Sequence, residues 1–161
     1  SQAAIYRHYR DKDELVLRIV GEGYGGLVRT LEGLVSGEAS PEEKLFAAFR
    51  GYIDFTMKRP ALFKALFLRD IGRAGRAVNV LDSGVSRQRR SFELLTGVLR
   101  QGMDEGCFEP ADAELTGQVL WSAVFGLAAR LAIEGASPKR VAALAERELG
   151  ILVRGLRPVG R

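Results

Sequence analysis

The chain has 161 residues, 47% hydrophobic and 27% charged, with a formal net charge of +4, the composition of a soluble globular protein with a real core. The mild positive charge is compatible with a nucleic-acid partner without proving one. Cys107 is the only cysteine, which excludes an internal disulfide and favours a reduced, cytoplasmic setting. The most apolar run, residues 120–133, is short for a bilayer and contains Arg130, so we expect no membrane protein.

The spacing of apolar residues predicts helices almost throughout, because no stretch alternates as a half-buried strand requires. A first long helix is predicted from Asp11, with Glu14 completing its cap, to residues 36–37. A second is predicted from Ser40 to Pro60, with Glu43 in a capping box, and a shorter helix follows Pro60. The apolar stripe of the first helix comprises Leu15, Val16, Ile19, Val20, Tyr24, Leu27, Val28, Leu31 and Val35.

The second half of the chain predicts three more helices after a loop at residues 71–79. The first covers residues 81–103, with Gly106 suited to its C-terminal cap. The next begins at Asp112 and ends at Gly135, and the last begins at Ser137. The helix after Asp112 is predicted to carry an apolar stripe of Leu115, Val119, Ala123, Leu127 and Leu131. The expected fold is therefore an all-α helical bundle.

Signs of catalysis or of a metal site are lacking in the sequence. His8 is the only histidine, and no HExxH, CxxC, GxGxxG or Walker-type motif occurs. The carboxylate pair Asp104 and Glu105 is expected to face water in a turn. We therefore expect no metal, no cofactor and no enzyme activity.

The opening stretch, SQAAIYRHYRDKDELVLRIV, resembles the signature of TetR-family (TetR/AcrR-like) transcriptional regulators. In that family, a recognition helix ends in a segment like Ser1 to Tyr9, and the next helix begins like residues 12–15. The stretches RPALFKALFLRD, QGMDEGCFEPAD and LWSAVFGLAARL are similar to later parts of the family fold, although Phe125 stands where one subclass has histidine.

The resemblance implies a division of the chain into two parts. Residues 1–36 would be the remnant of a helix-turn-helix domain that lacks its first two helices, with the recognition-helix end and the connecting helix. Residues 37–161 would be a helical ligand-binding and dimerisation domain. A recognition helix needs those two helices for support, so we expect this stretch alone to bind an operator poorly.

The resemblance also implies DNA contacts at the N-terminus. Gln2, Ala3 and Ala4 would face the major groove, where glutamine can read adenine and an alanine methyl can pack on thymine. The phosphate-contacting positions would be Ser1, Tyr6, His8 and Lys12. Two alternatives remain open: Tyr6 can pack as a core aromatic, and Lys12 can be a solvated charge.

The middle helices are rich in aromatic residues, most of which a bundle of this size needs for its core. Phe46 and Phe55, however, lie off the main apolar stripe of their helix. TetR-family proteins are similar in placing an effector pocket among these helices. We therefore expect an apolar pocket lined by some of Phe55, Met57, Phe63, Phe67, Phe92, Trp121 and Phe125.

The last two helices are the expected dimer surface, because small residues on one and a broad apolar face on the other suit a four-helix bundle. The predicted interface residues are Ala123, Leu127, Leu131, Ala145, Leu149, Leu152 and Leu156. The alternative is that these residues are buried inside one subunit.

The predicted function is that of a homodimeric, cytoplasmic, ligand-responsive transcriptional repressor. It would release double-stranded operator DNA on binding a small apolar or aromatic effector. The alternative is a dimeric helical interaction module, or a regulator without a small-molecule effector. Within the first long helix, residues 21–26 contain four glycines, which could form a hinge or could allow close helix packing.

Overall fold

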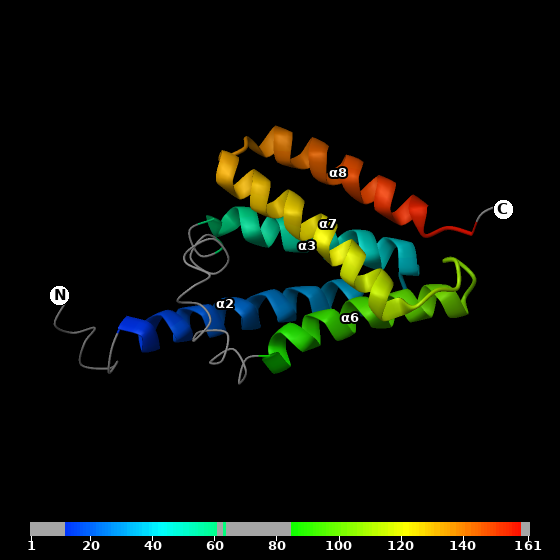
Figure 1. Cartoon of the computed structure of the whole chain (residues 1–161), viewed down its shortest axis with the longest axis horizontal. Coiled ribbons are helices and arrows are strands. Elements are labelled where there is room, and N and C mark those ends of the chain that lie inside the picture. The colour runs from blue at the N-terminus through cyan, green and yellow to red at the C-terminus, as the bar shows by residue number, and fades with distance from the viewer. Residues whose placement is uncertain (1–11, 61–62, 64–84, 159–161) are drawn as a thin grey trace.

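The computed structural model describes residues 12–60, 63 and 85–158, and within these ranges the fold is all-α, as predicted (Figure 1). The helices are α2 (Lys12–Val35), α3 (Pro41–Lys58), α6 (Val85–Asp104), α7 (Ala113–Glu134) and α8 (Pro138–Gly155). Helix α3 packs against all four of the others. In Figure 1, α2 and α6 lie along the lower side, α8 forms the upper edge, and α7 crosses between them.

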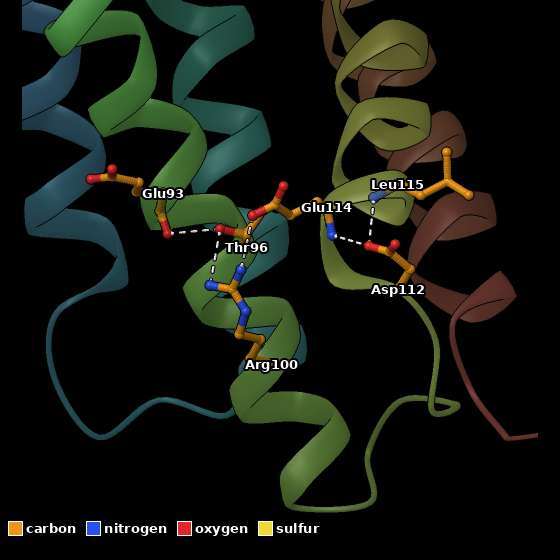
Figure 2. Close-up of polar contacts among 6 residues, drawn as sticks. All are labelled: Glu93, Thr96, Arg100, Asp112, Glu114 and Leu115. Carbon is orange, nitrogen blue, oxygen red and sulfur yellow. Dashed lines mark hydrogen bonds and ion pairs between the residues drawn. The ribbon is translucent and has the colours of Figure 1, made fainter.

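The predicted helix ends are confirmed where local signals set them. Ser40 caps α3 in a capping box: its Oγ accepts from the N–H of Glu43 at 3.3 Å, and its own N–H donates to Glu43 Oε2 at 2.9 Å. Asp112 caps α7 by accepting from the N–H groups of residues 114 and 115, as Figure 2 shows. Helix α7 ends at Gly135, which has a φ of +62°, and Ser137 then caps α8.

The end of α3 also follows the prediction. The helix stops at Lys58, and the N–H of Arg59 donates to Thr56 O at 3.1 Å. A new helical turn begins at Pro60, where the N–H of Phe63 donates to Arg59 O at 3.0 Å. The predicted loop at residues 71–79, and most of the short helix before it, lie outside the described residues.

One core joins all five helices. Its fully buried members include Leu45 and Ile53 of α3, Leu99 of α6 and Val124 of α7. Leu27 and Leu31 confirm part of the stripe predicted for α2, whereas the side chains before residue 22 lie outside the description. Helix α2 shares its core with α3 and α6, so packing alone does not separate it from the rest of the chain. The predicted division of the chain at residue 36 stays a prediction.

The buried side of α7 differs from the prediction. Leu115 and Val119 belong to the predicted apolar stripe, but they are 61% and 62% exposed. The residues that α7 buries are Ala113, Gly117, Leu120, Val124, Ala128, Leu131 and Ala132. The predicted stripe and the buried side differ because α7 is apolar on both faces, so its periodicity does not choose between them. By length and composition α7 could cross a membrane, but one such helix is weak support, since core helices of soluble proteins pass the same test.

Candidate ligand cavity and exposed helix face

A cavity of about 390 Å³ lies between α2, α6 and α7. This volume falls in the range of small-molecule sites. Its wall is formed by Tyr24, Leu27, Ser91, Phe92, Trp121, Ser122 and Phe125. Each helix turns one side to the cavity, since its lining residues are adjacent in the sequence or three to four positions apart. The cavity therefore depends on how three helices cross.

The chemistry of this wall is aromatic and uncharged. Phe92, Trp121 and Phe125 supply rings from two helices, while Tyr24 and two serines supply hydroxyl groups. None of the described lining residues is charged. The ring of Trp121 is held from behind by Tyr52, with ring centroids 4.7 Å apart. Such a wall suits an apolar or aromatic molecule with one or two uncharged polar groups.

The structure places three of the predicted pocket residues on this wall: Phe92, Trp121 and Phe125. Phe63 lies behind them, only 4% exposed, with its ring centroid 5.7 Å from that of Phe125. Phe55 is half-buried and lies under the guanidinium of Arg59, 4.4 Å from its ring centroid. Phe67 lies outside the described residues.

Met57 was among the seven candidates for this pocket, and the structure places it elsewhere. It lines a different groove, between the C-terminal half of α3, the end of α7 and the start of α8. The rim of that groove carries Arg50, which donates to Asp54 at 3.1 Å, and Lys58. Sequence reasoning placed Met57 by its apolar character, but its position on α3 turns it away from α2.

Four cavity residues were missed by the sequence prediction: Tyr24, Leu27, Ser91 and Ser122. Tyr24 and Leu27 were recognised as part of the apolar stripe of the first helix. One signal for Tyr24 was available: it is the only aromatic residue in the sequence of this helix. The two serines gave no signal, because a serine on a helix is common at any surface.

The exposed face of α7 is the second feature of interest. Leu115, Val119 and Ile133 are 61%, 62% and 60% exposed, and Ile151 of α8 is 52% exposed. Ser122 and Gly126 lie between them on the same side of α7 and are exposed as well. We call Leu115, Val119, Ser122, Gly126 and Ile133 the α7 outer stripe.

The predicted dimer residues divide into two groups. Leu131, Ala145 and Leu149 have no exposed surface, so they pack inside the single chain and cannot contact a partner. This corrects the prediction, because these positions belong to the core-facing sides of α7 and α8. The other four are half-buried: Ala123, Leu127, Leu152 and Leu156.

The predicted DNA-contacting residues are not placed by the structure. Ser1 to His8 lie outside the described residues, and Lys12 begins α2 without a described side chain. Within the described ranges, no group of three or more His, Cys, Asp and Glu side chains could hold a metal ion. These contacts therefore stay predictions.

Comparison with known families identifies the class of the protein. Residues 45–153 match the family model described as tetracyclin repressor-like, C-terminal domain. The match covers more than half of the chain, and it agrees with the resemblance carried by the N-terminal motif. The chain belongs to the TetR family of transcriptional regulators.

Solved structures share this fold. One is the TetR family transcriptional regulator PfmR from Thermus thermophilus, with 22% identity, a TM-score of 0.75, and coverage of 98% of this chain and 84% of that one. Another is the regulator FadR from Bacillus subtilis in complex with stearoyl-CoA, with 19% identity, a TM-score of 0.76, and coverage of 98% and 83%.

A third similar structure is the putative transcriptional regulator from Pseudomonas aeruginosa PAO1. It has 26% identity, a TM-score of 0.67, and coverage of 96% of this chain and 76% of that one. No curated protein matches the chain.

Proposed function

We propose that this protein is a homodimeric transcriptional repressor that releases its operator on binding a small, uncharged apolar or aromatic effector. The observation that carries the proposal is the aromatic cavity of about 390 Å³, which α2 helps to form. Helix α2 is also the element that follows the stretch resembling a recognition helix. One helix thus contributes to the ligand cavity and continues toward the segment expected to contact DNA.

The wall of the cavity defines the effector class. A ligand would place its apolar body among Phe92, Trp121 and Phe125, and an uncharged polar group near Tyr24 or the serines. FadR from Bacillus subtilis, which has the same fold, was solved with stearoyl-CoA. An acyl chain would suit the wall described here, whereas the phosphates of CoA would need cations that the described wall lacks. We therefore favour an uncharged effector.

The route from cavity to DNA would run along α2. Tyr24 and Leu27 face the cavity from this helix, within and just after the glycine-rich residues 21–26. An effector that contacts these two side chains better in one helix position than in another would shift the population of positions. Two subunits coupled in this way would change the distance between their recognition helices, and a palindromic operator would be released.

The α7 outer stripe supports the homodimer. Its exposed apolar and small residues would be covered by the same stripe of a second copy, in an isologous four-helix arrangement with α8. This would also explain why α7 is apolar on both faces. A reduced, cytoplasmic location fits the family and the single cysteine.

The proposal is tested by ligand binding and DNA release. Duplex DNA would be selected with the full-length protein, and a library of uncharged apolar and aromatic compounds would be screened for release of that DNA. Direct binding would be followed by the fluorescence of Trp121, the only tryptophan, which lies on the cavity wall. A screen without a binder would favour the alternative of a dimeric helical interaction module.

Variants of two residues localise the binding site. Phe125→Ala removes a ring from the wall and should weaken an effector by about tenfold or more, since a buried phenyl ring contributes about 1.5–3 kcal/mol. Met57→Ala is the matched control, because Met57 lines the groove on another side of α3. Equal losses in both variants, measured by titration, would contradict the assignment of the cavity.

A further inference from the structure

We propose that Gly117 determines how large an effector the cavity accepts, because its missing side chain leaves room for the ring of Phe92. Gly117 itself does not line the cavity; it lies on the buried side of α7, behind the cavity wall. The inference rests on the proposed function, since it concerns the effector site. It adds a specificity-determining residue that acts through its neighbour.

The contacts at Gly117 leave little space for a side chain. A Cβ atom at this position would lie 3.2 Å from Cε2 and 3.3 Å from Cζ of Phe92, and 3.3 Å from Cγ2 of Thr96. Carbon atoms pack best at about 3.5–4.0 Å. Even a methyl group would therefore be tight against both neighbours, and it would require each contact to open by a few tenths of an ångström.

Thr96 is the neighbour that is held in place. It is 2% exposed, and its Oγ1 donates to Glu93 O at 3.2 Å and accepts from Arg100 Nη1 at 3.5 Å. Arg100 in turn reaches Glu114 in the first turn of α7, with 3.4 Å between Nη2 and Oε1. Figure 2 shows this chain of contacts from α6 to α7. The chain of contacts opposes both a shift of Thr96 and a separation of the two helices near Gly117.

Phe92 is the neighbour with open space on one side, because it is half-buried and lines the cavity. Its ring is half-buried, with α7 on one side and the cavity on the other. A side chain at Gly117 would push the ring away from α7 and into the space that the described residues leave open at the cavity. The cavity would become smaller on its α6 side while its α2 side, at Tyr24 and Leu27, stays in place.

A smaller cavity should reject its largest ligands first. Well-packed sites tolerate a missing methylene better than an excess one, because excess volume forces side chains off their preferred positions. Ligands that do not fill the cavity should be little affected. Gly117 would thus set an upper limit on ligand size rather than the general affinity.

The test uses straight-chain 1-alkanols of increasing length as probes, because each combines an apolar body with one hydroxyl group. Binding would be followed by Trp121 fluorescence. The wild-type affinity should rise with chain length up to a limit. In Gly117→Ala, the longest alkanol bound by the wild type should bind about tenfold more weakly, while short ones change by less than about twofold.

Two further variants make the test specific. Gly97→Ala is the matched control, because Gly97 is a glycine of α6 with no atom within 4 Å of an added Cβ. It should keep the wild-type length limit. The single variant Phe92→Ala should allow longer alkanols to bind than the wild type does. Combined with Gly117→Ala, it should restore the binding of long alkanols, because the displaced ring is gone.

The outcomes separate the inference from the proposed function. An unchanged length limit in Gly117→Ala would overturn the inference and leave the effector cavity intact. A failure of Phe92→Ala to extend the limit would overturn it too, even if Gly117→Ala did not fold. If the wild type bound no alkanol at all, both the cavity assignment and the inference would be overturned.

Discussion

Tyr52 joins the core to the wall of the cavity. It is 3% exposed, and its ring supports Trp121 at a centroid distance of 4.7 Å. Its hydroxyl oxygen is buried and makes no hydrogen bond of good geometry among the described residues. Burial, with a smaller effect from the nearby Tyr24, raises the pKa of Tyr52 above its ordinary value. A side-chain hydrogen bond to Thr56 opposes this rise. The group therefore stays a neutral phenol whose hydroxyl is only weakly paired.

This leads to a prediction for Tyr52→Phe. Removing a buried, weakly paired hydroxyl should raise the free energy of unfolding by about 1 kcal/mol, since an unsatisfied polar group costs about 1–3 kcal/mol. The measurement is urea-induced unfolding of variant and wild type. Tyr24→Phe is the control: it removes the same hydroxyl from a residue on the cavity wall and should bring no gain. A loss of stability in Tyr52→Phe would instead show that the hydrogen bond to Thr56 outweighs the cost of burying the hydroxyl.

Single residues also show where sequence reasoning reaches its limit. The aromatic content of the middle helices predicted a cavity with Phe92, Trp121 and Phe125 on its wall, and the structure places them there. The same reasoning included Met57 and omitted Tyr24. Residue type indicates which side chains can line an apolar cavity, but only the crossing of helices decides which ones do.

At the scale of single helices, the ends were predictable and the buried sides only partly so. Ser40, Gly135 and Ser137 mark their helix ends through hydrogen bonds or backbone angles that involve near neighbours in sequence. The buried side of α7 depends on distant contacts. Because Leu115 and Val119 are as apolar as the residues of the core face, the sequence alone could not exclude them from the core.

Helix α2 carries the second prediction. It runs unbroken through its four glycines, and at Gly26 an added Cβ would meet only the Phe55 ring, at an ordinary 3.6 Å. Close packing therefore does not require a glycine at residue 26, and the hinge stays a prediction for the glycine-rich residues 21–26. The double variant Gly23→Ala and Gly25→Ala should stabilise the helix by roughly 1–2 kcal/mol and weaken effector-driven release of DNA.

The control for this helix is Gly33→Ala. Gly33 lies in the same helix, is exposed, and has no atom within 4 Å of an added Cβ. The variant Gly33→Ala should stabilise α2 by about 0.5–1 kcal/mol, as each replacement in the double variant does, without changing the response to the effector. The measurement is the effector concentration that releases half of the bound DNA. The same concentration for wild type and the double variant would rule out the hinge.

At the scale of the whole molecule, the fold class and the family were readable from the sequence. The N-terminal motif indicated the TetR family, and the match over residues 45–153 confirmed it. The residues of the dimer interface were harder to predict from the sequence. Leu131, Ala145 and Leu149 have the right chemistry for an interface but lie in the core, whereas Leu115, Val119 and Ile133, which were not among the predicted interface residues, are exposed. An apolar residue looks the same whether its own chain or a partner covers it.

The assembly gives the last prediction, for Val119→Asp. Val119 is 62% exposed in the single chain, so the change should alter the stability of a monomer by less than about 0.5 kcal/mol. In a symmetric dimer through the α7 outer stripe, it would bury two unpaired carboxylates, one from each copy, and weaken dimerisation by about 100-fold or more.

Gln118→Glu is the matched control, because it adds the same charge at the preceding position, on an exposed polar residue outside the stripe. Sedimentation velocity over a range of concentrations measures both variants. Gln118→Glu should remain dimeric where Val119→Asp is monomeric, because one helical position separates the two side chains by about 100° around the helix. If Val119→Asp stayed dimeric at wild-type concentrations, the interface would have to lie on another face, with the α7 outer stripe left facing water.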